Sequence, residues 1–127
     1  DYGHHPVEVD SNIKAIKEEF KDSNITMIFQ PHRFSRTAQL FHEFIKVLKQ
    51  VDTLIVLDVY AASEKPIKGI NSKTLVESIK QEGHLSVHHI QTEAEVMAFI
   101  KDQADLEILV TQGAGNISNI TSKIINL

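Results

Sequence analysis

The feature that most constrains the fold is a pair of near-continuous apolar runs, ITMIFQ at residues 25–30 and TLIVLDV at 53–59. Both runs are rich in β-branched residues, a pattern typical of strands that are covered on both faces. A stripe at helical spacing lies between them and consists of Phe41, Phe44, Ile45 and Leu48. This stripe predicts a helix over about 35–50, which is long enough to return the chain and make the two strands parallel.

The same alternation of helices and strands continues on both sides of this unit. Pro6, a residue favoured at the first helical position, precedes an apolar stripe that predicts a helix over 6–20. The later expected elements are a helix at about 72–82, a strand at 86–90, a helix at about 92–102, a strand at 106–111 and a helix from about 116. This order predicts an α/β fold with a doubly wound, mostly parallel sheet, a Rossmann-like three-layer sandwich. Ligands of such folds bind at the carboxyl ends of the strands.

Composition limits the size and the partners of the domain. A chain of 127 residues that is 42% hydrophobic fits one compact domain, so we expect residues 1–127 to form a single unit. The net charge of −4 argues against a nucleic-acid partner or an anionic membrane surface. No apolar run approaches the length of a membrane span. The absence of cysteine excludes disulfides and thiolate chemistry and fits a reducing compartment.

The motifs that usually bind nucleotide phosphates are missing. The Rossmann fingerprint G-x-G-x-x-G does not follow the first strand, where residues 30–36 read QPHRFSR. The one G-x-G, at 113–115, follows the last strand, and taken alone it indicates a tight turn. A P-loop, G-x-x-x-x-G-K-[ST], is also absent, so we do not expect this chain to bind a triphosphate and its Mg²⁺ in that way.

Histidine spacing argues against a metal site. His88 and His89 are neighbours on a predicted strand, so their side chains point to opposite faces and cannot bind one ion. His4 and His5 lack an i+4 partner and a nearby acid. We therefore predict that the chain holds no metal.

Two arginines follow the first predicted strand. Arg33 and Arg36 are three residues apart at an expected helix start, which would bring them onto one face. Guanidinium is always charged and binds carboxylate or phosphate through two parallel hydrogen bonds, and a helix N-terminus also favours anions. This pattern indicates an anion site. The alternative is that both arginines pair with acidic residues of the same chain, and the sequence leaves both readings open.

Four segments carry a family resemblance: DYGHHP at 1–6, FQPHRFSRT at 29–37, DVYAASEKPIKGI at 58–70 and QGAGNI at 112–117. In this order and spacing they resemble the C-terminal domain of the Mur ligases of peptidoglycan synthesis, and within them the UDP-N-acetylmuramate–L-alanine ligases. The resemblance spans the whole chain. One departure is Ser63, where the family usually has glycine.

The resemblance implies a bacterial, cytoplasmic enzyme of three domains, of which this chain is the third. The N-terminal domain would bind the UDP-sugar, and the central domain would bind ATP and Mg²⁺. The implied reaction transfers the γ-phosphoryl group of ATP to the carboxylate of UDP-N-acetylmuramate. The amino group of L-alanine then attacks the acyl phosphate and forms an amide. We therefore expect this chain alone to be inactive and to bind no cofactor tightly.

The resemblance also implies roles for individual residues, none of them catalytic. Arg33 and Arg36 would hold the carboxylate of L-alanine. The remaining assignments are His32 and His4 in the lining of the amino-acid pocket, and Asp1 and Tyr2 near the nucleotide, at the connection to the central domain. Two other functions remain open on the sequence alone: a stand-alone Rossmann-like module that binds a nucleotide or small anion, and a purely structural domain.

Overall fold

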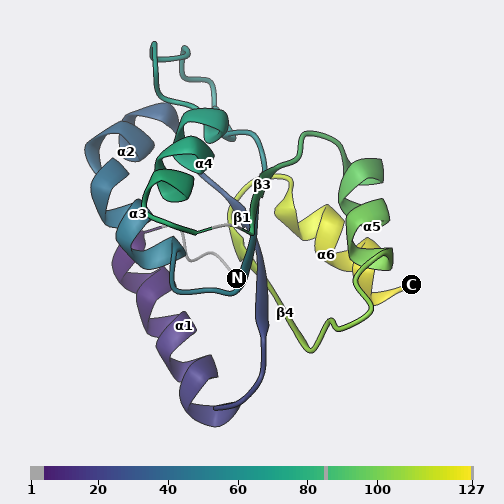
Figure 1. Ribbon diagram of the computed structural model, residues 1–127. Coiled ribbons are helices and arrows are strands. Elements are labelled where there is room, and N and C mark those ends of the chain that lie inside the picture. The colour runs from purple at the N-terminus through teal and green to yellow at the C-terminus, as the bar shows by residue number, and fades with distance from the viewer. Residues whose placement is uncertain (1–4, 85, 127) are drawn as a thin grey trace.

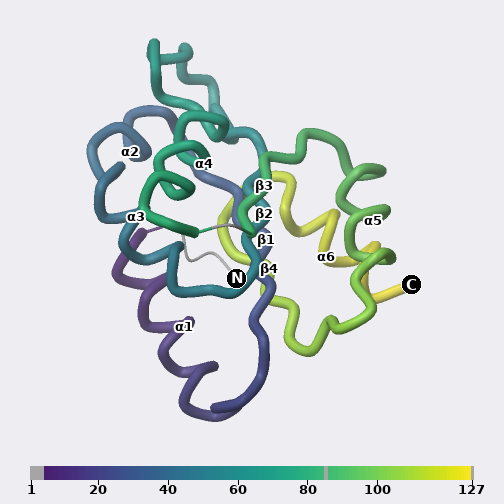
Figure 2. The backbone as a smooth tube through the Cα atoms, in the orientation of Figure 1, coloured from purple at the N-terminus to yellow at the C-terminus, as the bar shows by residue number. Residues whose placement is uncertain are grey.

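The computed structural model describes residues 5–84 and 86–126. In this part of the chain four strands form one sheet in the order β3-β2-β1-β4, and every neighbouring pair is parallel (Figure 2). The strands are β1 (Ile25–Gln30), β2 (Thr53–Val56), β3 (Val87–His89) and β4 (Ile108–Gly113). The helices are α1 (Pro6–Glu19), α2 (Phe34–Gln39), α3 (Phe41–Leu48), α4 (Ser72–Gln81), α5 (Glu93–Lys101) and α6 (Ile117–Ile125).

Helices cover both faces of this sheet. The helices α1 to α4 lie on one side, and α5 and α6 lie on the other (Figure 1). Successive β1 side chains point to the two layers, because Met27 and Phe29 join the core under α1, α3 and α4, whereas Ile28 joins the core under α5 and α6. The doubly wound, three-layered α/β fold predicted from the sequence is confirmed.

Most elements begin and end within two residues of their predicted bounds. The second strand is shorter than predicted, ending at Val56 rather than at 59, although the Leu57 N–H still donates to the Phe29 carbonyl (2.9 Å). None of the helices in the described ranges is both long and apolar enough to cross a bilayer.

The single helix predicted over 35–50 is wrong, because α2 and α3 are separate helices. The backbone leaves helical geometry at Leu40, where φ is −113° and ψ is 22°. Thr37 donates its hydroxyl to the Arg33 carbonyl (2.8 Å), and such back-bonding to the preceding turn often bends a helix. The apolar stripe that predicts the helix lies entirely within α3, so it carries no information about the break that precedes Phe41.

Two glycines allow β4 and the turn after it to approach their neighbours closely. Gly113 pairs with Gln30 at a φ of 124°, and a Cβ on Gly113 would lie 2.3 Å from the Gln30 carbonyl oxygen. Gly115 has a φ of 109°, and its Cβ would lie 2.5 Å from Cγ of Tyr60. Both positions therefore require glycine for two independent reasons, backbone conformation and space.

We expect Gly113→Ala to lower the melting temperature of the chain, followed by circular dichroism, more than Gly69→Ala does. Gly69 also has a positive φ, of 79°, but a Cβ there meets nothing within 4 Å. Unfavourable backbone conformation costs about 1–3 kcal/mol at either site. Only Gly113→Ala adds an overlap with the backbone of β1. Equal melting temperatures for the two variants would contradict the close approach.

Candidate functional site

The loops that follow β1 and β2 are joined beyond the end of the sheet. Tyr60 donates its N–H to the Pro31 carbonyl and accepts from the Arg33 N–H, both at 2.8 Å. The ring of Tyr60 stacks on that of His32, with centroids 5.7 Å apart and planes 11° apart. Because Gly115 approaches the same Tyr60 ring, three loops at the carboxyl edge meet at this one residue.

Arg33 lies one residue before α2 in an unusual backbone conformation. Its φ is 70°, a region that non-glycine residues rarely occupy and that costs free energy unless the surroundings hold it. The hydrogen bond from its N–H to Tyr60 supplies such a restraint. The guanidinium Nη1 is 4.0 Å from Oε2 of Glu64, and the Arg33 side chain is 45% exposed. This long, exposed ion pair holds Arg33 only loosely.

Arg36 lies inside α2 and is partly buried. Its Nη1 is shielded from solvent and has no hydrogen-bond partner among the described residues. A buried donor without a partner is costly, and a guanidinium cannot lose its charge to reduce that cost. An anion bound beside Arg36 would satisfy this group. Of the two arginines, Arg36 is therefore the stronger candidate for binding an anion.

The alternative that Arg33 and Arg36 pair with acidic residues of the same chain has limited support. Arg33 approaches Glu64 only at the limit of an ion pair, and Arg36 forms no ion pair with any acid in residues 5–84 and 86–126. Both guanidinium groups therefore retain the capacity to bind a carboxylate or a phosphate.

Glu64, in the loop between β2 and α4, holds the start of α2. Its carboxylate accepts hydrogen bonds from the Ser35 hydroxyl and from the Ser35 N–H. The bond from the Ser35 hydroxyl is the largest cause that lowers the pKa of Glu64 below its ordinary value of 4.5, followed by the Ser35 N–H. Arg33 adds a smaller attraction. Glu64 thus connects the projecting loop between β2 and α4 to the arginine segment (Figure 1).

Ser63, the departure from the family pattern, lies in the same loop with a φ of 71°. Ala62 before it also has a positive φ, of 50°. Glycine adopts this conformation at little cost, which gives a physical reason for the glycine that the family usually has at this position.

The contacts of Tyr60 and Glu64 were not predicted, because no motif signals a contact between residues about thirty positions apart.

The histidines implied by the resemblance are described only in part. His32 lies beside Tyr60 at the carboxyl edge. His4 falls outside the described residues, as do Asp1 and Tyr2, so their expected positions are not described. His5 is the N-cap of α1, where its Nδ1 accepts from the Val7 N–H (3.2 Å).

The described ranges contain no group of three or more histidine, aspartate or glutamate side chains arranged to hold a metal ion. The rings of His88 and His89 have different partners. His88 packs on Phe99, with ring centroids 4.8 Å apart, whereas His89 Nε2 is 2.6 Å from Oδ1 of Asp58.

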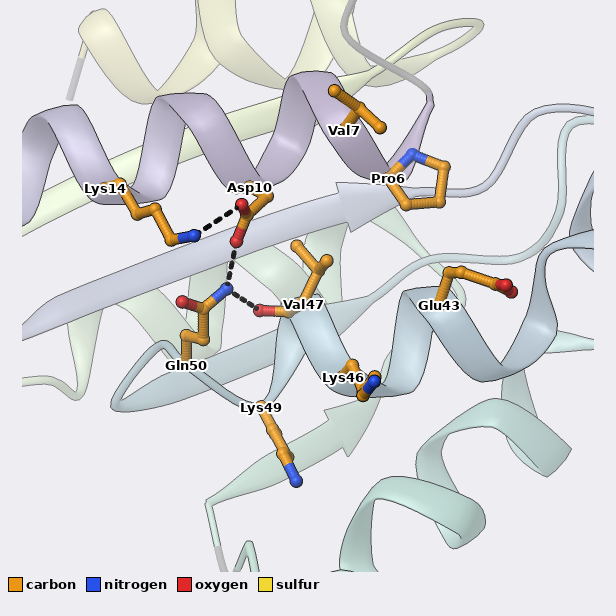
Figure 3. Close-up of a pocket in the computed structure, with 9 residues that line it drawn as sticks. All are labelled: Pro6, Val7, Asp10, Lys14, Glu43, Lys46, Val47, Lys49 and Gln50. Carbon is orange, nitrogen blue, oxygen red and sulfur yellow. Dashed lines mark hydrogen bonds and ion pairs between the residues drawn. The ribbon is translucent and has the colours of Figure 1, made fainter.

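A groove of about 530 Å³ lies between α1 and α3 (Figure 3). Asp10 in this groove already accepts from Gln50 (2.8 Å) and pairs with Lys14 (2.9 Å), and the bond from Lys14 is the main cause that lowers its pKa. None of the unpartnered buried atoms of the described residues belongs to the groove. We therefore do not assign a ligand to it.

Fold and site together define a Rossmann-like α/β domain with a cationic loop at the carboxyl end of its central strand. Residues 1–115 match the model of the family described as "Mur ligase, glutamate ligase domain". The chain belongs to this family, which confirms the resemblance to the Mur ligases found in the sequence.

Solved structures of Mur ligases share this fold. A UDP-N-acetylmuramate-alanine ligase from Thermotoga maritima is 25% identical with a TM-score of 0.76, and the match covers 99% of this chain and 25% of that one. A murein peptide ligase from Psychrobacter arcticus is 14% identical with a TM-score of 0.74, over 99% of this chain and 26% of that one. This chain therefore spans about a quarter of the length of each of these enzymes.

A third similar structure is a single domain of comparable size. It comes from Haemophilus ducreyi and is attributed to a UDP-N-acetylmuramate:L-alanyl-γ-D-glutamyl-meso-diaminopimelate ligase. It is 16% identical with a TM-score of 0.65, and the match covers 99% of this chain and 85% of that one. At this identity the likeness, like that to the Psychrobacter enzyme, shows the fold alone.

The pKa of Glu64 tests the link between its loop and α2. Because the folded-state pKa is lowered, Glu64 stabilises the fold fully above pH 4.5 and loses this contribution as pH falls through the lowered value. In an NMR titration of the Glu64 carboxyl carbon, we expect Ser35→Ala to raise this pKa toward 4.5. The exposed Ser118→Ala serves as the control and leaves it unchanged. A Glu64 pKa that is unchanged in Ser35→Ala would contradict the contact between Glu64 and Ser35.

Proposed function

We propose that this chain is the C-terminal domain of a bacterial, cytoplasmic ligase that joins L-alanine to UDP-N-acetylmuramate, and that Arg36 and Arg33 bind the carboxylate of L-alanine. The observation that carries the proposal is the buried Nη1 of Arg36, which has no partner among the described residues. The family membership and the likeness to the Thermotoga maritima alanine ligase support it. The sequence of residues 29–37 supports the same assignment.

The proposed contribution of the domain to the reaction is to orient the amino acid. An amine attacks an acyl phosphate efficiently only when it is held close to the acyl carbon in the correct direction. A carboxylate bound by Arg36 fixes one end of L-alanine, so the amino group at the other end can be directed at its target. Arg33 can join this contact by exchanging its loose pairing with Glu64 for the ligand carboxylate. His32, and His4 outside the described residues, would line the same pocket.

In our proposal ATP and Mg²⁺ bind mainly outside this chain. The sequence has no P-loop, and the described residues offer no cluster of acids or histidines for a metal ion. In our proposal a central domain of the same enzyme binds ATP and Mg²⁺, and an N-terminal domain binds the UDP-sugar. Asp1 and Tyr2 would lie near the nucleotide, at the connection to the central domain.

We expect Arg36→Ala, in the full-length ligase, to raise the concentration of L-alanine needed for half-maximal rate by at least tens-fold. Removing one partner of a desolvated charge pair costs about 2–5 kcal/mol. Arg36→Lys restores the affinity only in part, because an ammonium keeps the charge but lacks the planar fork. The matched control is Lys46→Ala, which removes an exposed cation from α3. Steady-state kinetics at saturating ATP and UDP-sugar measure the effect.

A second readout separates carboxylate binding from phosphate binding. In the Arg36→Ala enzyme, hydroxylamine still traps the acyl phosphate while amide formation collapses, because the first half-reaction does not need the amino acid. If Arg36→Ala abolishes trapping and leaves the alanine requirement normal, the arginine serves a phosphate. That result would overturn the proposal in favour of a nucleotide- or small-anion-binding role.

A further inference from the structure

A second polar pocket lies at the carboxyl edge, on the side of the sheet covered by α5 and α6. It has a volume of about 180 Å³ and is lined by Gln30, Leu57, Asp58, Gln91, Glu93, Asn116 and Ile120. Neither Arg33 nor Arg36 belongs to this lining. The pocket is therefore distinct from the arginine site, although both adjoin the end of β1.

Gln30 gives this pocket an unsatisfied hydrogen-bond acceptor. The residue is only 4% exposed, and its Nε2 donates to the Asp58 carbonyl (3.3 Å). This bond fixes the amide orientation, because a carbonyl oxygen cannot accept from Oε1. The Oε1 atom is then buried without a partner among the described residues, at a cost of about 1–3 kcal/mol. A ligand that donates a hydrogen bond would offset this cost.

The charges around the pocket favour a cation. Two carboxylates line it, those of Asp58 and Glu93, and none of the lining residues is basic. Each carboxylate has a basic neighbour outside the lining: Asp58 pairs with His89 (2.6 Å), and Glu93 pairs with Lys123. Their remaining acceptor capacity and the free Oε1 of Gln30 all point to a ligand that carries N–H donors.

Apolar groups complete the pocket. Leu57 is 4% exposed and Ile120 is 3% exposed, so both contribute buried hydrocarbon surface rather than polar partners. A ligand that fits these surfaces combines an ammonium end with a short hydrocarbon chain. A quaternary ammonium would satisfy the charge but has no N–H to donate to Gln30.

We propose that this pocket binds small primary alkylammonium groups, with the ammonium donating to Oε1 of Gln30 and its alkyl chain lying against Leu57 and Ile120. The carboxylates of Asp58 and Glu93 complement the positive charge. This site goes beyond the proposed ligase function and does not depend on it, because it uses none of the residues assigned to the L-alanine carboxylate.

The test is an NMR titration of ¹⁵N-labelled residues 1–127 with n-propylammonium chloride at constant ionic strength. We expect saturable shifts of the Gln30 side-chain amide and of the backbone N–H groups of Asp58 and Asn116. The neutral analogue n-propanol and the quaternary tetramethylammonium ion are compared at the same concentrations. Each should shift these signals at least several-fold less, because the first lacks the charge and the second lacks the N–H.

Variants connect the shifts to the acceptor. Gln30→Met keeps the length of the side chain but removes the carbonyl, and we expect it to abolish saturable binding. The matched control is Gln39→Met on the exposed side of α2, which leaves binding intact. If Gln30→Met fails to fold, Asp58→Asn provides the test, since loss of its charge weakens the binding of n-propylammonium.

Three outcomes would overturn the proposal. Absence of saturable shifts with n-propylammonium would mean that the pocket holds only water. Equal responses to n-propylammonium and n-propanol would mean that the pocket binds the hydrocarbon chain and does not recognise the ammonium group. Unchanged binding in both Gln30→Met and Asp58→Asn would place the amine elsewhere on the surface. None of these outcomes bears on the arginine site.

Discussion

The burial of β1 on both faces is the constraint on which the rest of the structure depends. All six of its residues are buried, and it pairs with β2 on one side and β4 on the other. A strand in this position needs helices on both faces and parallel neighbours that return through them, which sets the layers and the topology. The last residue of the strand, Gln30, is polar. The change from apolar to polar residues therefore takes place at the end of the central strand, where the chain leaves the core and the candidate site begins.

The site depends on contacts between loops more than on any single element. Tyr60 holds the loop after β1 through two backbone hydrogen bonds, its ring stacks on His32, and Gly115 leaves room for that ring. Glu64 binds the first turn of α2. These restraints offset the cost of the positive φ at Arg33 and fix the segment that carries Arg36. The two arginines are thus presented from a backbone that several contacts hold in place, and a binding site for a small anion requires such support.

Local patterns predicted much of the fold. The apolar runs at 25–30 and 53–59 gave the two central strands, and apolar spacing after Pro6 gave α1, because periodicity reports directly which side is buried. The break at Leu40 was missed, since the apolar stripe lies entirely within α3 and the back-bond of Thr37, which precedes it, leaves no trace in that stripe. The last strand was predicted two residues too early, at 106–111 instead of Ile108–Gly113, because apolar spacing does not report the register with β1 that sets these bounds.

The candidate site was predicted less completely than the fold. Arg33 and Arg36 could be identified from residue chemistry and from the resemblance, because guanidinium is always charged and binds carboxylate or phosphate through two parallel hydrogen bonds. The sequence could not show that Arg33 lies near Glu64 while Arg36 Nη1 is buried and unpartnered among the described residues. That distinction depends on the loop at residues 57–71, whose Glu64 contacts Ser35 and Arg33. The Gln30 pocket depends in the same way on three separate segments and has no local signature.

A crystal structure of the proposed full-length ligase with L-alanine and a non-hydrolysable ATP analogue would show directly what Arg36 binds. We expect a carboxylate oxygen of L-alanine about 2.7–2.9 Å from Nη1 of Arg36, the distance of a charge-assisted hydrogen bond. We also expect the alanine amino group to point away from α2, toward the substrate-binding domains. A phosphate oxygen of the nucleotide beside Arg36, with the alanine carboxylate bound elsewhere, would contradict the proposal.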